Sequence, residues 1–131
     1  MHNEVLATQR RDYSGLRFKN ITPTDVDGFM EIQGRVFIFF ELKHESMLPV
    51  DHSVFDGQRV AMERLVDTLP KPALFAYVGH NCRECDMIVA DGCVVCEYRS
   101  NAHWYNGRGL TLRQLIEHFL CKHGLSHYLP K

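Results

Sequence analysis

Four charged residues in two pairs could together act on a phosphodiester. Asp25 and Asp27 stand two positions apart, and Glu41 and Lys43 repeat this spacing further along the chain. Alternate residues of a β-strand point to the same face of a sheet, so each pair would present its charges on one side. Carboxylate oxygens suit a divalent cation, and a lysine beside such a cation can orient water and offset negative charge on a phosphate.

The sequence between the two pairs predicts a β-hairpin that would bring them together. Residues 26–32 and 36–42 are rich in β-forming side chains, and the second run is almost wholly apolar. Gln33-Gly34-Arg35 lies between the runs and favours a turn. If all three residues form the loop, Ile32 pairs with Val36.

The register of this hairpin decides whether the charged groups meet. Counting back from a three-residue loop places Asp27 opposite Glu41 and Asp25 opposite Lys43. Directly opposed Cβ atoms lie about 4.5–5.5 Å apart, so the carboxylates and the ammonium would converge on one patch of the sheet. A two-residue loop would instead put the two pairs out of register.

Two interpretations of this patch are open. Carboxylates this close repel one another unless a cation lies between them, and Mg²⁺ usually takes one or two protein carboxylates together with waters and phosphate oxygens. A solvated salt-bridge cluster is the simpler interpretation. The position of Glu41-Leu42-Lys43 favours the metal site, because these residues end an otherwise apolar strand, where charges are unfavourable without a role.

Hydrophobic periodicity predicts the elements that would position these residues. Phe55, Met62, Val66 and Leu69 form the apolar stripe of a helix, and Thr111 starts a capping box for the last helix. In chain order we expect a helix over 3–12, strands over 16–21, 26–32 and 36–42, a helix over 53–69, strands over 73–78 and 93–98, a polar aromatic turn over 103–107 and a helix over 111–124. This order predicts an α/β fold with a central mixed sheet.

Length and composition agree with one globular domain over residues 1–131. The chain is 131 residues long, 45% hydrophobic, and has a formal net charge of -1, which excludes a polybasic nucleic-acid binder. No apolar run is long enough to span a membrane, and no secretory signal is visible. We therefore expect a cytoplasmic protein without a membrane partner.

The cysteines indicate a second metal site. Cys82, Cys85, Cys93 and Cys96 form two Cys-x-x-Cys pairs within a Cys-rich insertion over 80–97. Two such pairs can close a tetrahedral structural Zn²⁺ site, as in a zinc knuckle. Free buried thiols, or redox and disulfide chemistry, are the alternatives.

The hairpin and its charged residues resemble the PD-(D/E)XK nuclease superfamily, and small phage and mobile-element endonucleases in particular. The likeness covers about residues 13–78 and rests on Asp25-Val26-Asp27-Gly28, the hairpin and Glu41-Leu42-Lys43, with a helix and a strand expected before and after them. It implies a restriction-endonuclease-like αβββαβ core with a central mixed sheet. To this core the chain would add the Cys-rich loop, an extra strand and a C-terminal helix.

Carried over to this sequence, the resemblance implies that Asp27 and Glu41 ligate Mg²⁺ or Mn²⁺. It also implies that the Leu42 carbonyl helps to hold the metal and that Lys43 is the catalytic lysine. Asp25 is the alternative match to the family's aspartate, because it lies nearer to a proline. Asp27 is favoured because a glycine follows it and its distance to Glu41 along the chain fits better.

Other polar residues are further candidates. Gln58 lies on the apolar stripe of the helix over 53–69, where relatives often place a glutamine that faces the site; a solvated first-turn amide is the alternative. Glu4 would match the first-helix glutamate of some relatives, or is an ordinary exposed residue. His44 and His52 flank the strand end and the helix start, where they would contact a phosphate or simply form polar surface.

Basic and aromatic side chains offer a rim for a nucleic-acid substrate. Arginines beside aromatic rings stack on bases or hold a backbone, although solvated charge is the commoner explanation. The candidates are Arg10, Arg11, Arg17 and Lys19 before the hairpin, and Arg99 and Arg108 around Trp104-Tyr105.

These patterns predict a Mg²⁺-dependent endonuclease that hydrolyses DNA and leaves a 5′-phosphate. One chain carries one site, so a monomer would nick DNA and a homodimer would cut both strands. Two other classes stay open: a non-catalytic module that uses the same fold to bind nucleic acid or protein, and a zinc-dependent adaptor. Binding insensitive to EDTA and to substitution of Asp27 would favour the module. Loss of partner binding without unfolding in Cys82→Ser would favour the adaptor.

Overall fold

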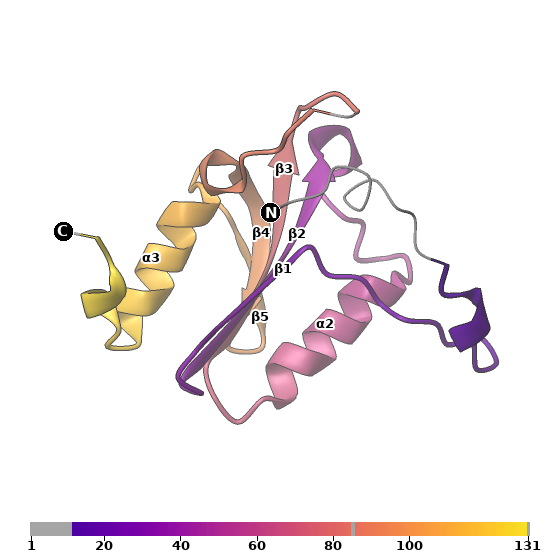
Figure 1. Cartoon of the computed structure of the whole chain (residues 1–131), viewed down its shortest axis with the longest axis horizontal. Helices are drawn as coiled ribbons and strands as arrows, with labels where there is room; N and C mark the ends of the chain where they lie inside the picture. The colour runs from indigo at the N-terminus through magenta and orange to yellow at the C-terminus, as the bar shows by residue number, and fades with distance from the viewer. Residues whose placement is uncertain (1–11, 85, 131) are drawn as a thin grey trace, which may run out of the picture.

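A five-stranded sheet with a helix on each face forms the centre of the molecule (Figure 1). The computed structural model describes residues 12–84 and 86–130. Its strands are β1 (Gly28–Ile32), β2 (Val36–His44), β3 (Ala73–His80), β4 (Val94–Ser100) and β5 (His103–Asn106). Its helices are α2 (Gly57–Thr68) and α3 (Leu112–Lys122), with short 3-10 turns η1 (Ser14–Leu16), η2 (Glu45–Met47), η3 (Ala90–Gly92) and η4 (Ser126–Tyr128).

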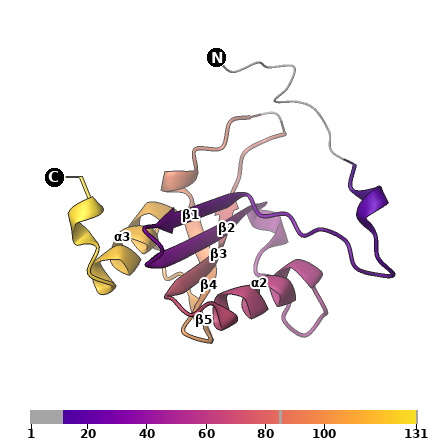
Figure 2. The same ribbon diagram turned by 60° about the horizontal axis from the view of Figure 1, so that its bottom comes forward.

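The sheet is mixed, as the order of elements predicts. Its strands follow chain order from β1 to β5; of the described strands, β2 and β3 run parallel and the other neighbours run antiparallel. α2 forms the crossover between β2 and β3, which a parallel pair requires. Figure 2 shows β1 at the outer edge of the sheet. The predicted α/β class with a central mixed sheet is therefore confirmed.

Each face of the sheet carries its own core, because side chains alternate along β2 and β3. Even-numbered residues such as Ile38, which is fully buried, belong to one cluster with Leu115 of α3. Odd-numbered residues such as Phe75 belong to another cluster with Met62 of α2. Residues 73–78 of β3 are all buried, since both faces of this central strand are covered. The face that carries Phe75 is the one that also presents Glu41 and Lys43, as their odd numbers require.

α2 begins later than the apolar periodicity predicts. The carboxylate of Asp56 accepts a hydrogen bond from the Arg59 backbone N–H at 3.0 Å and so caps the helix just before Gly57. Phe55, expected on the buried stripe, is instead 79% exposed. The cap determines the start because the N–H groups of a first helical turn need acceptors.

Polar side chains of α2 form hydrogen bonds with side chains of β4 and β5. Arg99 of β4 makes two hydrogen bonds to Asp67, at 3.0 and 2.6 Å, and Trp104 Nε1 donates to Glu63 at 2.6 Å. Both side chains are thus committed to the packing of α2. The expectation that Arg99 and Trp104 form a free rim for nucleic acid does not hold.

A short strand, β5, replaces the aromatic turn predicted over 103–107. Asn101 and Ala102 have φ angles of 54° and 62°, and they make the two-residue turn that joins β4 to β5. Tyr105 then stacks on Tyr98 of the neighbouring strand, with ring centroids 5.2 Å apart. Periodicity missed β5 because the strand has only four residues and half of them are polar. The capping box predicted at Thr111 is confirmed at the start of α3.

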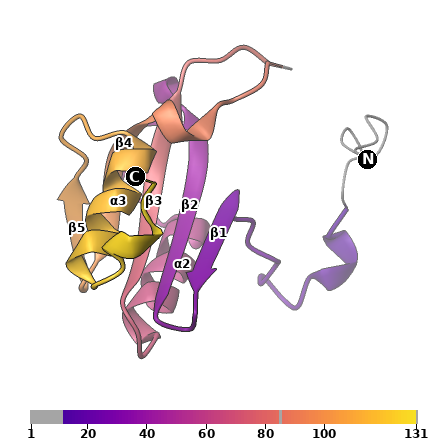
Figure 3. The same cartoon turned by 60° about the vertical axis from the view of Figure 1, so that its left-hand side comes forward.

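The strand predicted over 16–21 is wrong. Phe18 and Ile21 pair with each other across a tight turn in which Lys19 has a φ of 59°. Their side chains are 69% and 68% exposed, so the core of the described chain does not cover them. Figure 3 shows this segment running away from the sheet edge at β1. The predicted helix over 3–12, with Glu4, Arg10 and Arg11, lies outside the described residues except for its last position.

In the described residues, no helix combines the length and the apolar character needed to cross a membrane.

Candidate active site

The β1–β2 hairpin has the three-residue loop that the sequence predicts. Ile32 pairs with Val36, and the ladder continues without a shift to the pair Gly28 and Phe40. Gln33 and Gly34 have φ angles of 52° and 67°, the left-handed conformation that closes the turn. Asp27 and Glu41 therefore come next along the two strands, just beyond the last ladder pair.

Asp27 and Glu41 interlock across this end of the hairpin. The Asp27 backbone N–H donates to Glu41 Oε1 at 3.1 Å, and the Leu42 backbone N–H donates to Asp27 Oδ2 at 2.7 Å. Each carboxylate is thus held by the backbone of the opposite strand. An ionised carboxylate offers about four lone-pair sites, so both groups keep acceptor capacity for a ligand.

Gln58, in the first turn of α2, closes one side of the site. Its Nε2 donates to the Asp25 carbonyl oxygen at 2.8 Å, and its amide lies close enough to the Glu41 carboxyl group to lower the pKa of that group. The contact ties the segment before β1 to α2 and brings a neutral donor to the carboxylates. Gln58 lies one helical turn before the buried Met62, so its polar side chain is on the face of α2 that packs against the sheet.

Lys43 lies two residues beyond Glu41 on the same face of β2. Its Nζ is 6.0 Å from the centroid of the Tyr77 ring on β3, and its positive charge lowers the pKa of Glu41. Asp25 does not lie opposite Lys43 as the register count predicts. The ladder ends at Gly28, and the described contact of Asp25 with the site is made by its backbone carbonyl.

The carboxyl group of Glu41 is electrostatically unfavourable when ionised. Burial has the largest effect and raises the pKa of Glu41. Gln58 lowers this pKa, whereas the Asp27 side chain raises it through a side-chain hydrogen bond and its negative charge. The smaller effect of Lys43 does not cancel these, so the pKa stays above the ordinary glutamate value of 4.5. Two carboxylates in this relation favour a cation between them.

Two further groups on this face were not found from the sequence. Tyr77 pairs with Glu41 on one side and with Glu97 of β4 on the other, and its fully buried hydroxyl has no hydrogen-bond partner among the described residues. Glu97 Oε1 lies 2.7 Å from His52 Nε2, which joins the loop before α2 to the sheet. Alternation along β3 and β4 would have placed both groups on this face, but only once the strand order was known.

The two histidines predicted near the site, His44 and His52, lie on opposite faces of the sheet. His52 lies on the side of the carboxylates, edge-on to Trp104 with ring centroids 4.9 Å apart. His44, at an even position of β2, faces the other side of the sheet, where it lies edge-on to His80 and bonds to Ser46. His44 is therefore not part of the site.

The donors at this site fit a hard divalent cation. Among the described residues, no three His, Cys, Asp or Glu side chains gather closely enough to hold a metal by themselves. Mg²⁺ does not need three, because it usually takes one or two protein carboxylates and completes its shell with waters and phosphate oxygens. Asp27 and Glu41, with oxygen atoms alone to offer, match that requirement.

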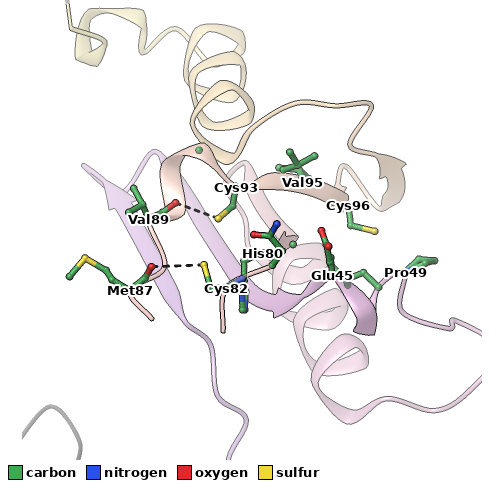
Figure 4. Close-up of a pocket in the computed structure, with 14 residues that line it drawn as sticks. Glu45, Pro49, His80, Cys82, Met87, Val89, Cys93, Val95 and Cys96 are labelled. Atoms are coloured by element: carbon green, nitrogen blue, oxygen red, sulfur yellow. Dashed lines mark hydrogen bonds between the residues drawn. The ribbon is translucent and has the colours of Figure 1, made fainter. Parts of the chain in front are cut away.

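The Cys-rich insertion borders a separate cavity of about 670 Å³, lined by His80, Cys82, Cys93 and Cys96 among others (Figure 4). The Cys82 and Cys93 thiols contact the Met87 and Val89 carbonyl oxygens, whereas Cys96 points the other way. Burial raises the pKa of Cys93 and of Cys96, which keeps them protonated without a metal. Cys85 lies outside the described residues, so zinc at the two pairs stays a prediction.

Purified protein should carry one zinc ion per chain if the two pairs bind it, and inductively coupled plasma mass spectrometry measures this directly. Cys82→Ser should remove the metal and lower the melting temperature by roughly 10 °C, because structural zinc contributes several kcal/mol to folding. Cys121→Ser, at an exposed thiol of α3, is the matched control. A metal-free protein with unchanged stability in Cys82→Ser would contradict the zinc prediction.

Comparison of the chain with protein-family models, with curated proteins and with solved structures found no match.

Proposed function

We propose that this chain is a Mg²⁺-dependent endonuclease that hydrolyses phosphodiester bonds of DNA. In this proposal β1, β2, α2 and β3 form the ββαβ part of a restriction-endonuclease-like core, which the PD-(D/E)XK resemblance implies. The observation that carries the proposal is the interlock of Asp27 and Glu41 across the hairpin. Gln58 and Lys43 lie near enough to lower the pKa of Glu41.

Each residue has a separate task in the proposed reaction. Asp27 and Glu41 would hold the cation, which when bound polarises a phosphate oxygen and activates water. The Lys43 ammonium opposes the negative charge that grows on the phosphate and offers N–H donors to the attacking water. The Gln58 amide restrains Glu41 and adds a neutral donor. Water adds to phosphorus and the bond to O3′ breaks, which leaves a 5′-phosphate and a 3′-hydroxyl.

Asp25, the other candidate aspartate, has no part in holding the cation under this proposal. Wild-type protein should convert supercoiled plasmid to the relaxed form in Mg²⁺ but not in EDTA. Asp25→Asn should cut within about threefold of the wild-type rate, because the contact of Asp25 with the site comes from its backbone. If Asp25→Asn loses as much of the cleavage rate as Asp27→Asn, the choice of Asp27 over Asp25 as the metal ligand is wrong.

Plasmid binding without cleavage, with the same affinity in EDTA as in Mg²⁺, would favour the non-catalytic module.

A further inference from the structure

A groove of about 370 Å³ continues the proposed active site beyond Lys43. It runs between the end of β2 and the loop before α2, and its lining includes Lys43, Met47, Val54, Phe55 and the carboxylates of Asp51 and Asp56. Met47, Val54 and Phe55 are 60%, 57% and 79% exposed. Three large apolar side chains thus surround a groove next to a lysine, and apolar walls with a few polar groups are typical of ligand sites.

The chemistry of the groove fits a nucleobase better than a phosphate. The Phe55 side chain is largely exposed, and every base can stack on an aromatic ring that solvent reaches. Asp51 and Asp56 would repel a second phosphate, since Ser53 holds Asp51 ionised by lowering its pKa and Asp56 caps α2. The same carboxylates accept hydrogen bonds from the exocyclic amino groups of cytosine and adenine. Lys43, at the inner end, places a positive charge where an adjoining phosphate would lie.

A second exposed aromatic ring lies on the opposite side of the carboxylates. Phe29 of β1 is 57% exposed and stacks on Phe39, with ring centroids 4.8 Å apart. Phe39, Glu41 and Lys43 follow one another at alternate positions of β2, on the same face. Phe29 and the groove therefore bracket the carboxylates along the direction of β2.

We infer that the substrate is an unpaired DNA strand that lies along β2, with the base beside the scissile phosphate stacked on Phe55 in this groove. A base inside a duplex has both faces covered by its neighbours and cannot stack on a side chain without leaving the helix. Phe29 would stack the base on the other side of the cut. The inference rests on the proposed nuclease function for the position of the scissile phosphate, but its binding test does not require cleavage.

Fluorescence anisotropy with Glu41→Gln protein, labelled oligonucleotides and Mg²⁺ measures binding separately from cleavage. A single strand should bind at least about tenfold more tightly than the duplex of the same sequence. Adding Phe55→Ala should weaken single-strand binding by about five- to a hundredfold, the range for loss of one stacked base. Phe55→Trp should retain it. Phe18→Ala removes a ring of similar exposure outside the groove and should change nothing.

Two results would overturn the inference: duplex bound as tightly as single strand, or an unchanged affinity in Phe55→Ala. Because Phe55 is exposed, its loss should leave the melting temperature unchanged, which separates binding from folding. Failure of the proposed function looks different. Phe55-dependent binding of single strands with no cleavage by wild-type protein would reject the nuclease and keep the binding site. Equal cleavage of single-stranded and duplex DNA by wild-type protein would keep the nuclease function and reject the single-strand binding site.

Discussion

Glu41→Gln should reduce DNA cleavage about a thousandfold or more, and at the same time it should stabilise the metal-free protein. The amide keeps the shape of the side chain and can still accept the Asp27 N–H. It cannot supply a negatively charged ligand, and loss of metal activation removes several kcal/mol of transition-state stabilisation. Without metal, the substitution removes a carboxylate that burial and Asp27 make unfavourable.

The gain in stability should depend on pH with a defined sign. Because the folded-state pKa of Glu41 is raised, its contribution to folding is complete below the ordinary value of 4.5 and is lost as pH rises through the raised value. Glutamine does not titrate. In EDTA the variant should therefore match the wild type near pH 4 and exceed it at pH 7.5. Since Glu41 is half-buried and partly screened by solvent, we expect at most about 1 kcal/mol, or roughly 2–5 °C.

Calorimetry in EDTA and in Mg²⁺ checks both parts of this prediction. Mg²⁺ should raise the melting temperature of the wild type, because a ligand of the folded state stabilises it, and should leave Glu41→Gln unchanged. The two proteins should thus exchange order when the metal is added. A variant that is less stable than the wild type at neutral pH in EDTA would show that Glu41 stabilises the fold, as in an ordinary salt-bridge cluster.

Lys43→Ala should lower the cleavage rate by about a hundred- to a thousandfold and leave metal binding intact. The ammonium is placed to oppose charge that develops on the phosphate, and removing one such donor from an active site has an effect of this size. Lys43 offers no lone pair to a cation while it is protonated. Mg²⁺ should therefore stabilise Lys43→Ala as much as it stabilises the wild type, in contrast to Glu41→Gln.

Single-turnover cleavage and Mg²⁺-dependent melting of the same Lys43→Ala sample separate the two roles. Lys71→Ala, an exposed lysine in the loop between α2 and β3, serves as the matched control and should cut at the wild-type rate. Cleavage by Lys43→Ala at the control rate would remove the lysine from the chemistry. Loss of the Mg²⁺ response would instead show that Lys43 shapes the metal site.

The register of the hairpin could be predicted because local rules determine it. A three-residue loop and strict alternation leave one way to pair Ile32 with Val36, and Asp27 then meets Glu41. The same count failed for Asp25, since nothing in a register says where a ladder ends. The chain leaves β1 at Gly28, and α2 takes the Asp25 carbonyl through Gln58.

Local sequence patterns could not predict features that depend on contacts between segments far apart in the chain. Tyr77 and Glu97 join the face of Glu41 because β3 lies between β2 and β4, an order that periodicity does not encode. The strand predicted over 16–21 failed for the related reason that β propensity reflects packing against neighbours, and Phe18 and Ile21 remain exposed. Phe55 was placed on a buried stripe, but the Asp56 cap turned it outward to the groove.

The comparison of wild-type protein with Glu41→Gln on supercoiled plasmid and on a single-stranded oligonucleotide, in Mg²⁺ and in EDTA, decides whether the Asp27–Glu41 pair is a nuclease site. Both proteins should be folded, with the variant at least as stable in EDTA. We expect the wild type to relax the plasmid in Mg²⁺ alone and Glu41→Gln to leave it supercoiled under every condition. Equal cleavage by the two proteins, or cleavage of neither the plasmid nor a single-stranded oligonucleotide by the wild type, would contradict the assignment of the Asp27–Glu41 pair as a nuclease site.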